Sequence, residues 1–384
     1  MRDGDLLSGT PIVVPLGGHA KWIALSDNGV VWVVAIAGHG RWVAALDDRG
    51  HELSRVSLGP LSDATRRTPG GSSLRVADDG SAWVDADGQL LRVAPDGTVL
   101  ASLGVGEPDD EVLGFLLLPD GFIVSLHKRH LGEVPPRIIR VGTDGAVRWR
   151  TDLPQANLGP PNQAVWHTQH LLVSGSSLLA SFQDDDHGMC RSICLDLESG
   201  TVRWQTGAGP QHSQTILGPD RFLIGWYGYG DHHMVAFDPA GLETQRWEHH
   251  AWVVVGPDEI PRGPETENQT SAFSRFHPDG RVERGEPLEA WYTAYPALTA
   301  SGWTVFHRED EHLVAVDPAG VKHRVWAGEP RERYADTRIV LGPTGTVMFG
   351  IGGQLCIVPT SLGPLADGPW PCGGLNLRNN PVAL

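Results

Sequence analysis

The chain has 384 residues, and its 46 Asp and Glu against 30 Lys and Arg give a net charge of −16. Such an acidic chain lacks the basic face that nucleic acid or an anionic membrane requires, so neither partner is expected. No run approaches about 18 apolar residues, and the start MRDGDLLSGTPIVV lacks a charged segment followed by an apolar one, so we expect no membrane helix and no secretory leader. We therefore expect a cytoplasmic monomer.

One short sequence pattern recurs along the chain: an apolar strand, an acidic Gly turn, then a second strand that often ends in Trp. The seven turn glycines are Gly50, Gly97, Gly145, Gly200, Gly241, Gly280 and Gly320. Their spacings of 47, 48, 55, 41, 39 and 40 residues, without a helical segment between them, are typical of a β-propeller. The prediction is an all-β protein built from four-stranded blades.

A second set of turns falls between the first two strands of each blade, near Gly29, Gly80, Gly121, Gly175, Asp220, Asp258, Gly302 and Gly345. This set has eight members, so the last blade lacks an outer strand, which residues 10–16 (TPIVVPL) are suited to supply. Closing the ring in this way removes an exposed sheet edge. We predict one domain over residues 1–384, with the closing strand at 10–16, blades over 17–367 and a C-terminal tail at 368–384. Seven blades are the alternative, if the short segment 73–103 merges with a neighbouring blade.

The wording of the repeat resembles the PQQ-like repeats of the quinoprotein-dehydrogenase-like propellers, most clearly in LDLESGTVRWQTG at 195–207. The tail GPWPCGGLNLRNNP at 368–381 is also similar to a PWP segment found on bacterial propellers of this kind. The resemblance implies eight blades and a tryptophan docked between neighbouring blades at Trp149, Trp204, Trp247 and Trp326. PQQ itself is not expected, because PQQ dehydrogenases of that family carry a secretory signal and adjacent cysteines, whereas Cys190, Cys194, Cys356 and Cys372 are scattered.

Histidines are distributed unevenly among the loops that this parsing predicts. Twelve of the 17 fall in connections between blades or between the second and third strands of a blade, which emerge on one face of the ring. These are His19, His39, His127, His130, His187, His212, His232, His233, His249, His250, His307 and His312. Long loops on a rigid scaffold commonly carry binding sites, so this face is the predicted functional face.

The connections between blades place several polar side chains at the mouth of the central channel. We predict a divalent metal held by His187, His212, His232 and His250, because imidazoles from adjacent blades are common ligands. His19 and Tyr292 are the predicted general acid and base. The predicted substrate-binding residues are Lys21, Glu111, Gln163, Trp291 and Asp336.

These residues support two hypotheses. The first is a metal-assisted lyase or hydrolase that acts on a small or oligomeric polar substrate. The alternative is a non-catalytic module that binds a protein partner or another ligand through the same face, where Tyr227, Tyr229, Trp291 and Tyr292 would provide aromatic contacts. Sugar binding by these aromatic residues without a metal is a further form of the alternative. No GxSxG, Walker A or HExxH motif favours another reaction class.

Overall fold

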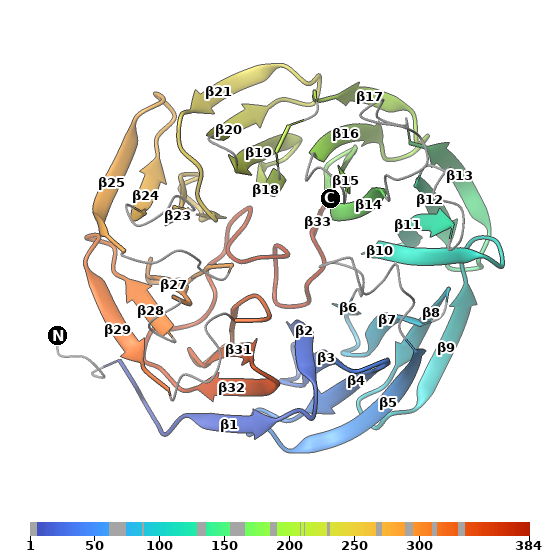
Figure 1. The fold of residues 1–384 in the computed structure, drawn as a ribbon, viewed down its shortest axis with the longest axis horizontal. Helices are drawn as coiled ribbons and strands as arrows, with labels where there is room; N and C mark the ends of the chain where they lie inside the picture. The colour runs from blue at the N-terminus through green and yellow to red at the C-terminus, as the bar shows by residue number, and fades with distance from the viewer. Residues whose placement is uncertain are drawn as a thin grey trace.

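The computed structural model describes residues 6–60, 74–86, 88–128, 136–153, 166–184, 190–207, 209–210, 212–228, 231–265, 271–288, 295–308, 313–328 and 335–384. These residues form eight antiparallel sheets arranged around a central axis (Figure 1), and no helix occurs among them. In this described part of the chain no helix is long and apolar enough to cross a membrane. The protein is an eight-bladed β-propeller, as predicted.

The first four blades follow the chain from the innermost to the outermost strand. Blade 1 contains β2 (His19–Leu25), β3 (Val31–Ala37), β4 (Gly40–Leu46) and β5 (Glu52–Pro60). Blade 2 contains β6 (Leu74–Val76), β7 (Ala82–Ala86), β8 (Gln89–Val93) and β9 (Val99–Gly104). Blade 3 contains β10 (Asp110–Leu118), β11 (Gly121–Lys128), β12 (Arg137–Gly142) and β13 (Val147–Asp152). Blade 4 contains β14 (Trp166–Ser174), β15 (Ser177–Asp184), β16 (Cys190–Asp196) and β17 (Val202–Gln205).

The next three blades repeat this order and the eighth departs from it. Blade 5 contains β18 (His212–Gly218), β19 (Arg221–Gly228), β20 (Asp231–Phe237) and β21 (Glu243–Trp247). Blade 6 contains β22 (Val254–Val255), β23 (Pro261–Pro264), β24 (Ala272–Phe276) and β25 (Val282–Pro287). Blade 7 contains β26 (Ala297–Leu298), β27 (Thr304–Phe306), β28 (Leu313–Val316) and β29 (Lys322–Trp326). Blade 8 contains β30 (Val340–Leu341), β31 (Val347–Ile351), β32 (Gln354–Val358) and, from the other end of the chain, β1 (Ile12–Pro15).

The pairing of β1 with β32 closes the ring. The two strands are antiparallel, with Ile12 opposite Ile357 and Val13 opposite Cys356. This confirms the closing strand predicted at residues 10–16. Because β6 to β9 form a sheet of their own, blade 2 does not merge with a neighbour, and the seven-bladed alternative is excluded.

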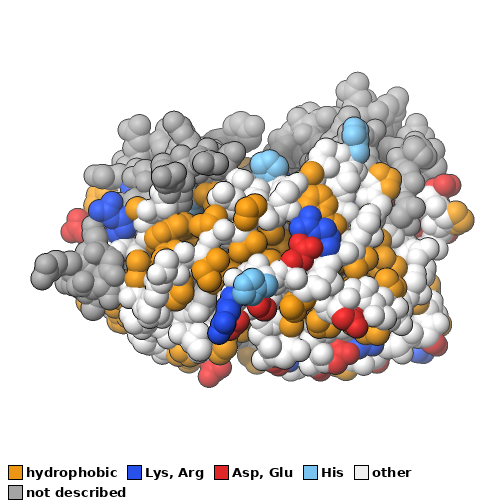
Figure 2. Space-filling model, turned by 90° about the horizontal axis from the view of Figure 1, so that it is seen from below, with side chains coloured by type: hydrophobic (Ala, Val, Ile, Leu, Met, Phe, Trp, Pro, Cys, Tyr) orange, Lys and Arg blue, Asp and Glu red, His pale blue; other side chains and the backbone are white. Residues whose placement is uncertain are grey.

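Burial changes from the axis to the rim, as the periodicity of the strands requires. The inner strand β18 is buried at every position, whereas outer strands such as β5 and β9 alternate between exposed and half-buried side chains. An inner strand contacts neighbouring blades on both faces, while an outer strand has one face toward solvent. The outer wall therefore mixes hydrophobic and charged side chains (Figure 2), and Val13 and Leu53 are 42% and 50% exposed there.

The turn glycine and the strand-end tryptophan of the repeat form one packing unit between blades. All seven turn glycines have φ between 70° and 88°, a conformation that favours glycine. A Cβ on Gly200 would lie 2.5 Å from the Trp149 ring, and one on Gly241 would lie 2.4 Å from the Trp204 ring. Gly200 and Gly241 therefore also make room for the tryptophan of the preceding blade.

The indole nitrogens of these tryptophans donate hydrogen bonds to the turn of the next blade. Trp149 donates to the Leu197 carbonyl at 3.0 Å, Trp204 to the Pro239 carbonyl at 3.2 Å, and Trp247 to the His277 carbonyl at 2.8 Å. The predicted docking of tryptophans between blades is confirmed at these three positions. In the fourth, Trp326 of blade 7 lies edge to face with Phe349 of blade 8, with ring centroids 6.3 Å apart.

Replacing Trp247 with phenylalanine is expected to lower the free energy of unfolding by about 2 kcal/mol, because a buried indole and its hydrogen bond are lost. Trp247 is 3% exposed, whereas Trp204 is half-buried. The same substitution at Trp204 should therefore cost less. Urea unfolding of the two variants measures the difference, and equal losses would contradict the graded effect of burial.

The segment after β32, residues 359–384, crosses the ring on the face formed by the turns between the first and second strands (Figure 1). We call this segment the tail; it leaves blade 8 at residue 359, before the predicted start of the tail at 368. It contacts the inner strands near those turns at six blades. The amides of Leu25, Val76, Val173, Val255 and Leu298 donate to the tail carbonyls of Leu377, Arg378, Pro381, Trp370 and Pro371, respectively, and the Leu117 amide donates to the Asn380 side chain.

At its end the tail becomes a strand, β33 (Val382–Ala383), which pairs in parallel with β14. The middle of the tail is held by Arg338, whose buried guanidinium donates to the carbonyls of Ile23, Gly373, Asn376 and Leu377. The tail thus covers the turn-lined end of the central channel, and the opposite end carries the predicted functional face.

Candidate functional site

The described site residues predicted from the sequence form two groups on opposite sides of the ring (Figure 1). His212, His232 and His250 belong to blade 5 and to its connection with blade 6, whereas His19 and Lys21 begin blade 1. In a ring of eight blades, blades 1 and 5 face each other across the axis. The structure therefore does not bring His19 next to the predicted metal ligands.

Blade 5 carries aromatic side chains on both faces of its sheet. Successive residues of a strand point to opposite faces, so Trp226 and Tyr227 at the end of β19 face different neighbouring blades. Trp226 packs beside His212 and His233, with ring centroids 4.7 and 4.8 Å away. The His233 ring is nearly parallel to the indole, at 13°, and its Nδ1 lies 2.6 Å from an Asp231 carboxylate oxygen.

On the other face, Tyr227 begins a series of rings that continues into blades 6 and 7. Tyr227 stacks on His250 with centroids 4.6 Å apart, and its ring lies 5.4 Å from Trp252. Trp252 in turn meets Tyr295 edge to face at 4.5 Å. Tyr227 and Trp252 are half-buried and Tyr295 is exposed, so this aromatic series is open to a ligand. We call Tyr227, His250, Trp252 and Tyr295 the aromatic series.

The two buried imidazoles of this region are held by serines. His212 Nδ1 lies 3.1 Å from Ser192 Oγ of blade 4, and His250 Nε2 lies 2.7 Å from Ser213 Oγ. Burial lowers the pKa of each imidazole to about 3, with smaller contributions from the surrounding histidines. His170 on β14 belongs to the same environment, and burial lowers its pKa to about 4. These side chains are neutral at pH 7.

Three ring nitrogens near blade 5 are buried and have no hydrogen-bond partner among the described residues. They are Nε2 of His212, Nδ1 of His232 and Nδ1 of His249. Glu265 lies 3.8 Å from His249 Nδ1, but its carboxylate already accepts two hydrogen bonds from Arg284. A buried polar atom without a partner costs free energy, so a bound ligand or water would stabilise this region.

The predicted metal centre stays a prediction. His187 lies outside the described residues, so the structure does not test the complete set of His187, His212, His232 and His250. Within the described ranges, no three His, Cys, Asp or Glu side chains are placed to hold a metal ion. His212 and His250 each direct one ring nitrogen to a serine.

His19, Lys21 and Asp336 form the second group, where blade 1 meets blade 8. His19 Nδ1 lies 3.7 Å from an Asp336 carboxylate oxygen, and the Gly352 amide donates to the same oxygen at 2.9 Å. Burial raises the pKa of Asp336, while the charges of His19 and Lys21 act in the opposite direction. This group combines a half-buried carboxyl with two exposed or partly exposed basic side chains at the channel.

The other predicted residues are placed individually. Glu111 lies on β10 and is buried at 3% exposure, opposite His127 of β11 in the strand register. Its burial within blade 3 separates it from both groups. Gln163, Tyr229, Trp291 and Tyr292 lie outside the described residues.

We call the histidines His212, His232, His249 and His250, with the serines and aromatic rings that contact them, the blade 5 region. The sequence analysis did not identify four of its members, Ser192, Ser213, Trp226 and Trp252. One signal was present for Trp226: in the segment WYGYGDHH a short hairpin places Trp226 opposite His233 and Tyr227 opposite His232, as the register shows. The serines had no such signal, because Ser192 reaches His212 from a different blade.

No protein-family model matches the sequence, and no curated protein matches it either. Solved structures do resemble the fold. BamB from Moraxella catarrhalis is 13% identical, with a TM-score of 0.59 over 92% of this chain and 99% of its own. A catalytically inactive virginiamycin B lyase from Staphylococcus aureus, solved with quinupristin, is 13% identical, with a TM-score of 0.51 over 91% of this chain and 99% of its own. The Dos1 propeller is 8% identical, with a TM-score of 0.62 over 94% of this chain and 97% of its own.

These identities establish likeness of fold alone. They support the β-propeller architecture, and membership in the PQQ-like repeat family stays a prediction. The similar structures include a protein named as a lyase and others that are not named as enzymes. The fold therefore does not choose between catalysis and binding, and the choice rests on the site.

Proposed function

We propose that the protein is a non-catalytic binding module whose blade 5 region binds a neutral, hydroxyl-rich ligand such as an oligosaccharide. The observation that carries this proposal is that the buried Nδ1 atoms of His232 and His249 have no hydrogen-bond partner among the described residues and that the aromatic series is next to them, since His232 is opposite Tyr227 in the register and His249 precedes His250. Neutral imidazole both donates and accepts hydrogen bonds, which suits hydroxyl groups. Half-buried aromatic rings offer apolar contact to the C–H face of a sugar.

Charge supports the choice of a neutral ligand. The imidazoles of His212 and His250 are neutral at pH 7 because burial lowers their pKa to about 3. They therefore do not attract an anion by charge, and the net charge of −16 opposes anionic ligands over the whole molecule. The two carboxylates described near these imidazoles already have partners, since Glu265 is paired with Arg284 and Asp231 lies 2.6 Å from His233 Nδ1.

Replacing Trp252 with alanine is expected to weaken oligosaccharide binding about tenfold, because the ligand loses a stacking surface worth on the order of 1.4 kcal/mol. Calorimetric titration with a panel of neutral tri- and tetrasaccharides measures the affinity. Trp303 is the matched control, since it is half-buried but packs on His323 at the turn-lined face. Trp303→Ala should leave the affinity unchanged.

Two results would contradict the proposal: no neutral oligosaccharide binds, or a stoichiometric metal is found whose removal abolishes binding. The second result would favour the metal-assisted lyase or hydrolase. That hypothesis keeps one supporting observation, because a carboxyl with a raised pKa such as Asp336 beside His19 suits proton transfer. Chromatography of the titrated oligosaccharides would reveal cleavage if this second candidate were correct.

A further inference from the structure

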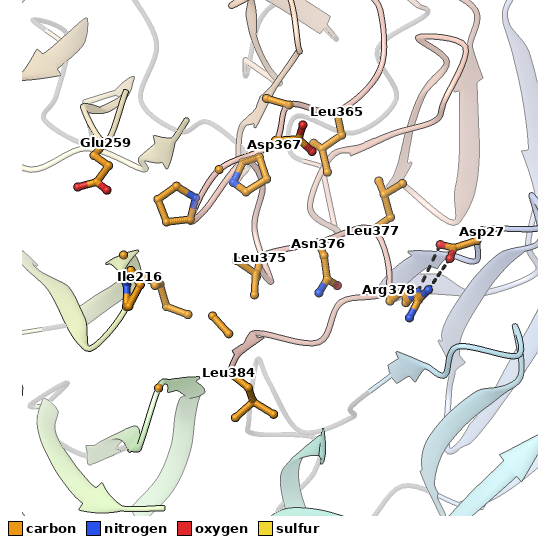
Figure 3. Close-up of a pocket in the computed structure, with 18 residues that line it drawn as sticks. Asp27, Ile216, Glu259, Leu365, Asp367, Leu375, Asn376, Leu377, Arg378 and Leu384 are labelled. Atoms are coloured by element: carbon orange, nitrogen blue, oxygen red, sulfur yellow. Dashed lines mark hydrogen bonds and ion pairs between the residues drawn. The ribbon is translucent and has the colours of Figure 1, made fainter. Parts of the chain in front are cut away.

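A cavity of about 710 Å³ lies between the tail and blade 5, on the face opposite the aromatic series. Its size falls within the range typical of ligand pockets. Figure 3 shows Ile216 and Glu259 on the propeller side, with Leu375, Asn376 and Asp367 of the tail around the remaining space. No residue of the blade 5 site belongs to this lining, so the cavity is a separate feature.

The position of the cavity follows from how the tail binds the ring. At blades 1, 2, 3, 4, 6 and 7, one amide near the end of the inner strand donates to the tail. At blade 5 the corresponding residue is Leu217, for which the described residues include no bond to the tail. Blade 5 lies between two blades that do pair with the tail: blade 4 pairs with β33, and blade 6 pairs with Trp370.

Blade 6 shows what kind of segment fits such a strand end. Residues 217–220 (LGPD) of blade 5 and 255–258 (VGPD) of blade 6 have nearly the same sequence. At blade 6 the tail is extended, and Trp370 and Val255 exchange both backbone hydrogen bonds, at 2.7 and 3.0 Å. The Trp370 side chain is buried in the cluster that also contains Ile216 and Leu217. An extended chain with an apolar residue is thus the occupant that this type of strand end accepts.

The lining adds a charge preference. The apolar part of the lining includes Ile216, Leu365 and Leu375. The lining contains three carboxylates: Asp27 is paired with Arg378 (Figure 3), Glu259 lies 3.4 Å from the Arg221 guanidinium, and Asp367 is the third. Arg378 is the only basic residue in the lining, so the cavity is acidic overall and favours a cationic occupant.

We propose that this cavity binds an extended peptide segment of a partner protein, with an apolar centre and basic flanks. The peptide backbone would add to the edge of β18 at Leu217, as the tail adds to β22 at Val255, which is recognition by strand addition. The apolar side chain would enter the cavity, and a basic flank would approach Asp367. The proposal is independent of the proposed function, because it concerns the opposite face.

The probe for the test is the fluorescein-labelled peptide Lys-Gly-Pro-Trp-Pro-Lys, which places basic residues around the GPWP sequence that the tail uses at blade 6. Fluorescence anisotropy with the full-length protein measures its affinity. Leu384→Trp narrows the cavity at an exposed position and should weaken binding at least about tenfold. Leu242→Trp is the matched control, because Leu242 is 65% exposed against 69% for Leu384 but does not line the cavity. It should leave the affinity unchanged.

Two further arms test the charge and the backbone pairing. Asp367→Lys should weaken binding of the basic probe about fivefold and strengthen binding of the matching peptide with Glu at both ends. A probe methylated on the tryptophan amide should bind at least about tenfold more weakly if its backbone pairs with β18. Equal affinity of the basic and acidic peptides, an unchanged affinity in Leu384→Trp, or equally tight binding of free tryptamine would each overturn the proposal.

Discussion

Replacing Arg338 with methionine is expected to lower the free energy of unfolding by about 3 kcal/mol. The guanidinium donates to four backbone carbonyls, of which those of Asn376 and Leu377 lie at 2.7 Å. Each hydrogen bond to a charged group contributes about 1.5–3 kcal/mol, but burying the charge costs several kcal/mol and lowers the pKa of Arg338. The difference between these opposing terms is the expected loss. Methionine fills most of the space, so the loss reports the hydrogen bonds and not a cavity.

Hydrogen exchange locates the effect and urea unfolding gives its size. The amides of Leu25, Val76 and Val173 donate to the tail, so they should exchange faster in Arg338→Met if the tail loosens. Arg246→Met is the control, because Arg246 is partly exposed and pairs with Glu243 within one strand; it should cost less than about 1 kcal/mol. If those three amides kept their protection in Arg338→Met, Arg338 would not be what holds the tail.

The architecture could be predicted because it repeats. Seven of the eight blades carry the turn glycine, and the spacing of those glycines indicates the repeat without knowledge of any long-range contact. The closing strand could be inferred in the same way, since eight first turns against seven last turns require one outer strand from elsewhere. The packing role of Trp149, Trp204 and Trp247 was implied by the resemblance of the repeat to the PQQ-like repeats, and the structure confirms it at these positions.

The path of the tail could not be predicted, because its contacts have no periodicity. Arg338 binds carbonyls that lie 35 to 39 residues further along the chain and also that of Ile23 near the other end. The blade 5 region was predicted only in part for a similar reason. The sequence singled out the histidines around blade 5, but it did not show that His212 and His250 contact Ser192 and Ser213 on other strands. The separation of His19 from His212 follows from ring position, which spacing along the chain does not express.

Acidification from pH 6.5 to about pH 4 is expected to destabilise the protein steeply, and the histidines of blades 4 and 5 are the cause. Burial lowers the pKa of His212 and His250 to about 3 and that of His170 to about 4, against 6.5 for an ordinary histidine. In this pH range the unfolded chain binds protons at these residues and the folded chain does not. The free energy of unfolding therefore falls as the pH falls, by up to about 1.4 kcal/mol per pH unit for each group.

The stability that carboxylates contribute is lost at lower pH than the stability that depends on the neutral histidines, so the two losses can be measured separately. Asp196, whose pKa is lowered to about 2 mainly by its hydrogen bond from Arg203, contributes stability that is lost only as the pH falls from about 4 toward 2.

His250→Gln keeps a partner for Ser213 and removes one titrating group, so its unfolding free energy should depend less on pH between 6.5 and 4, by about 1.4 kcal/mol per unit. His51→Gln is the control, because the His51 side chain is 74% exposed. An identical pH slope in wild type and His250→Gln would mean that His250 is already protonated in the folded protein.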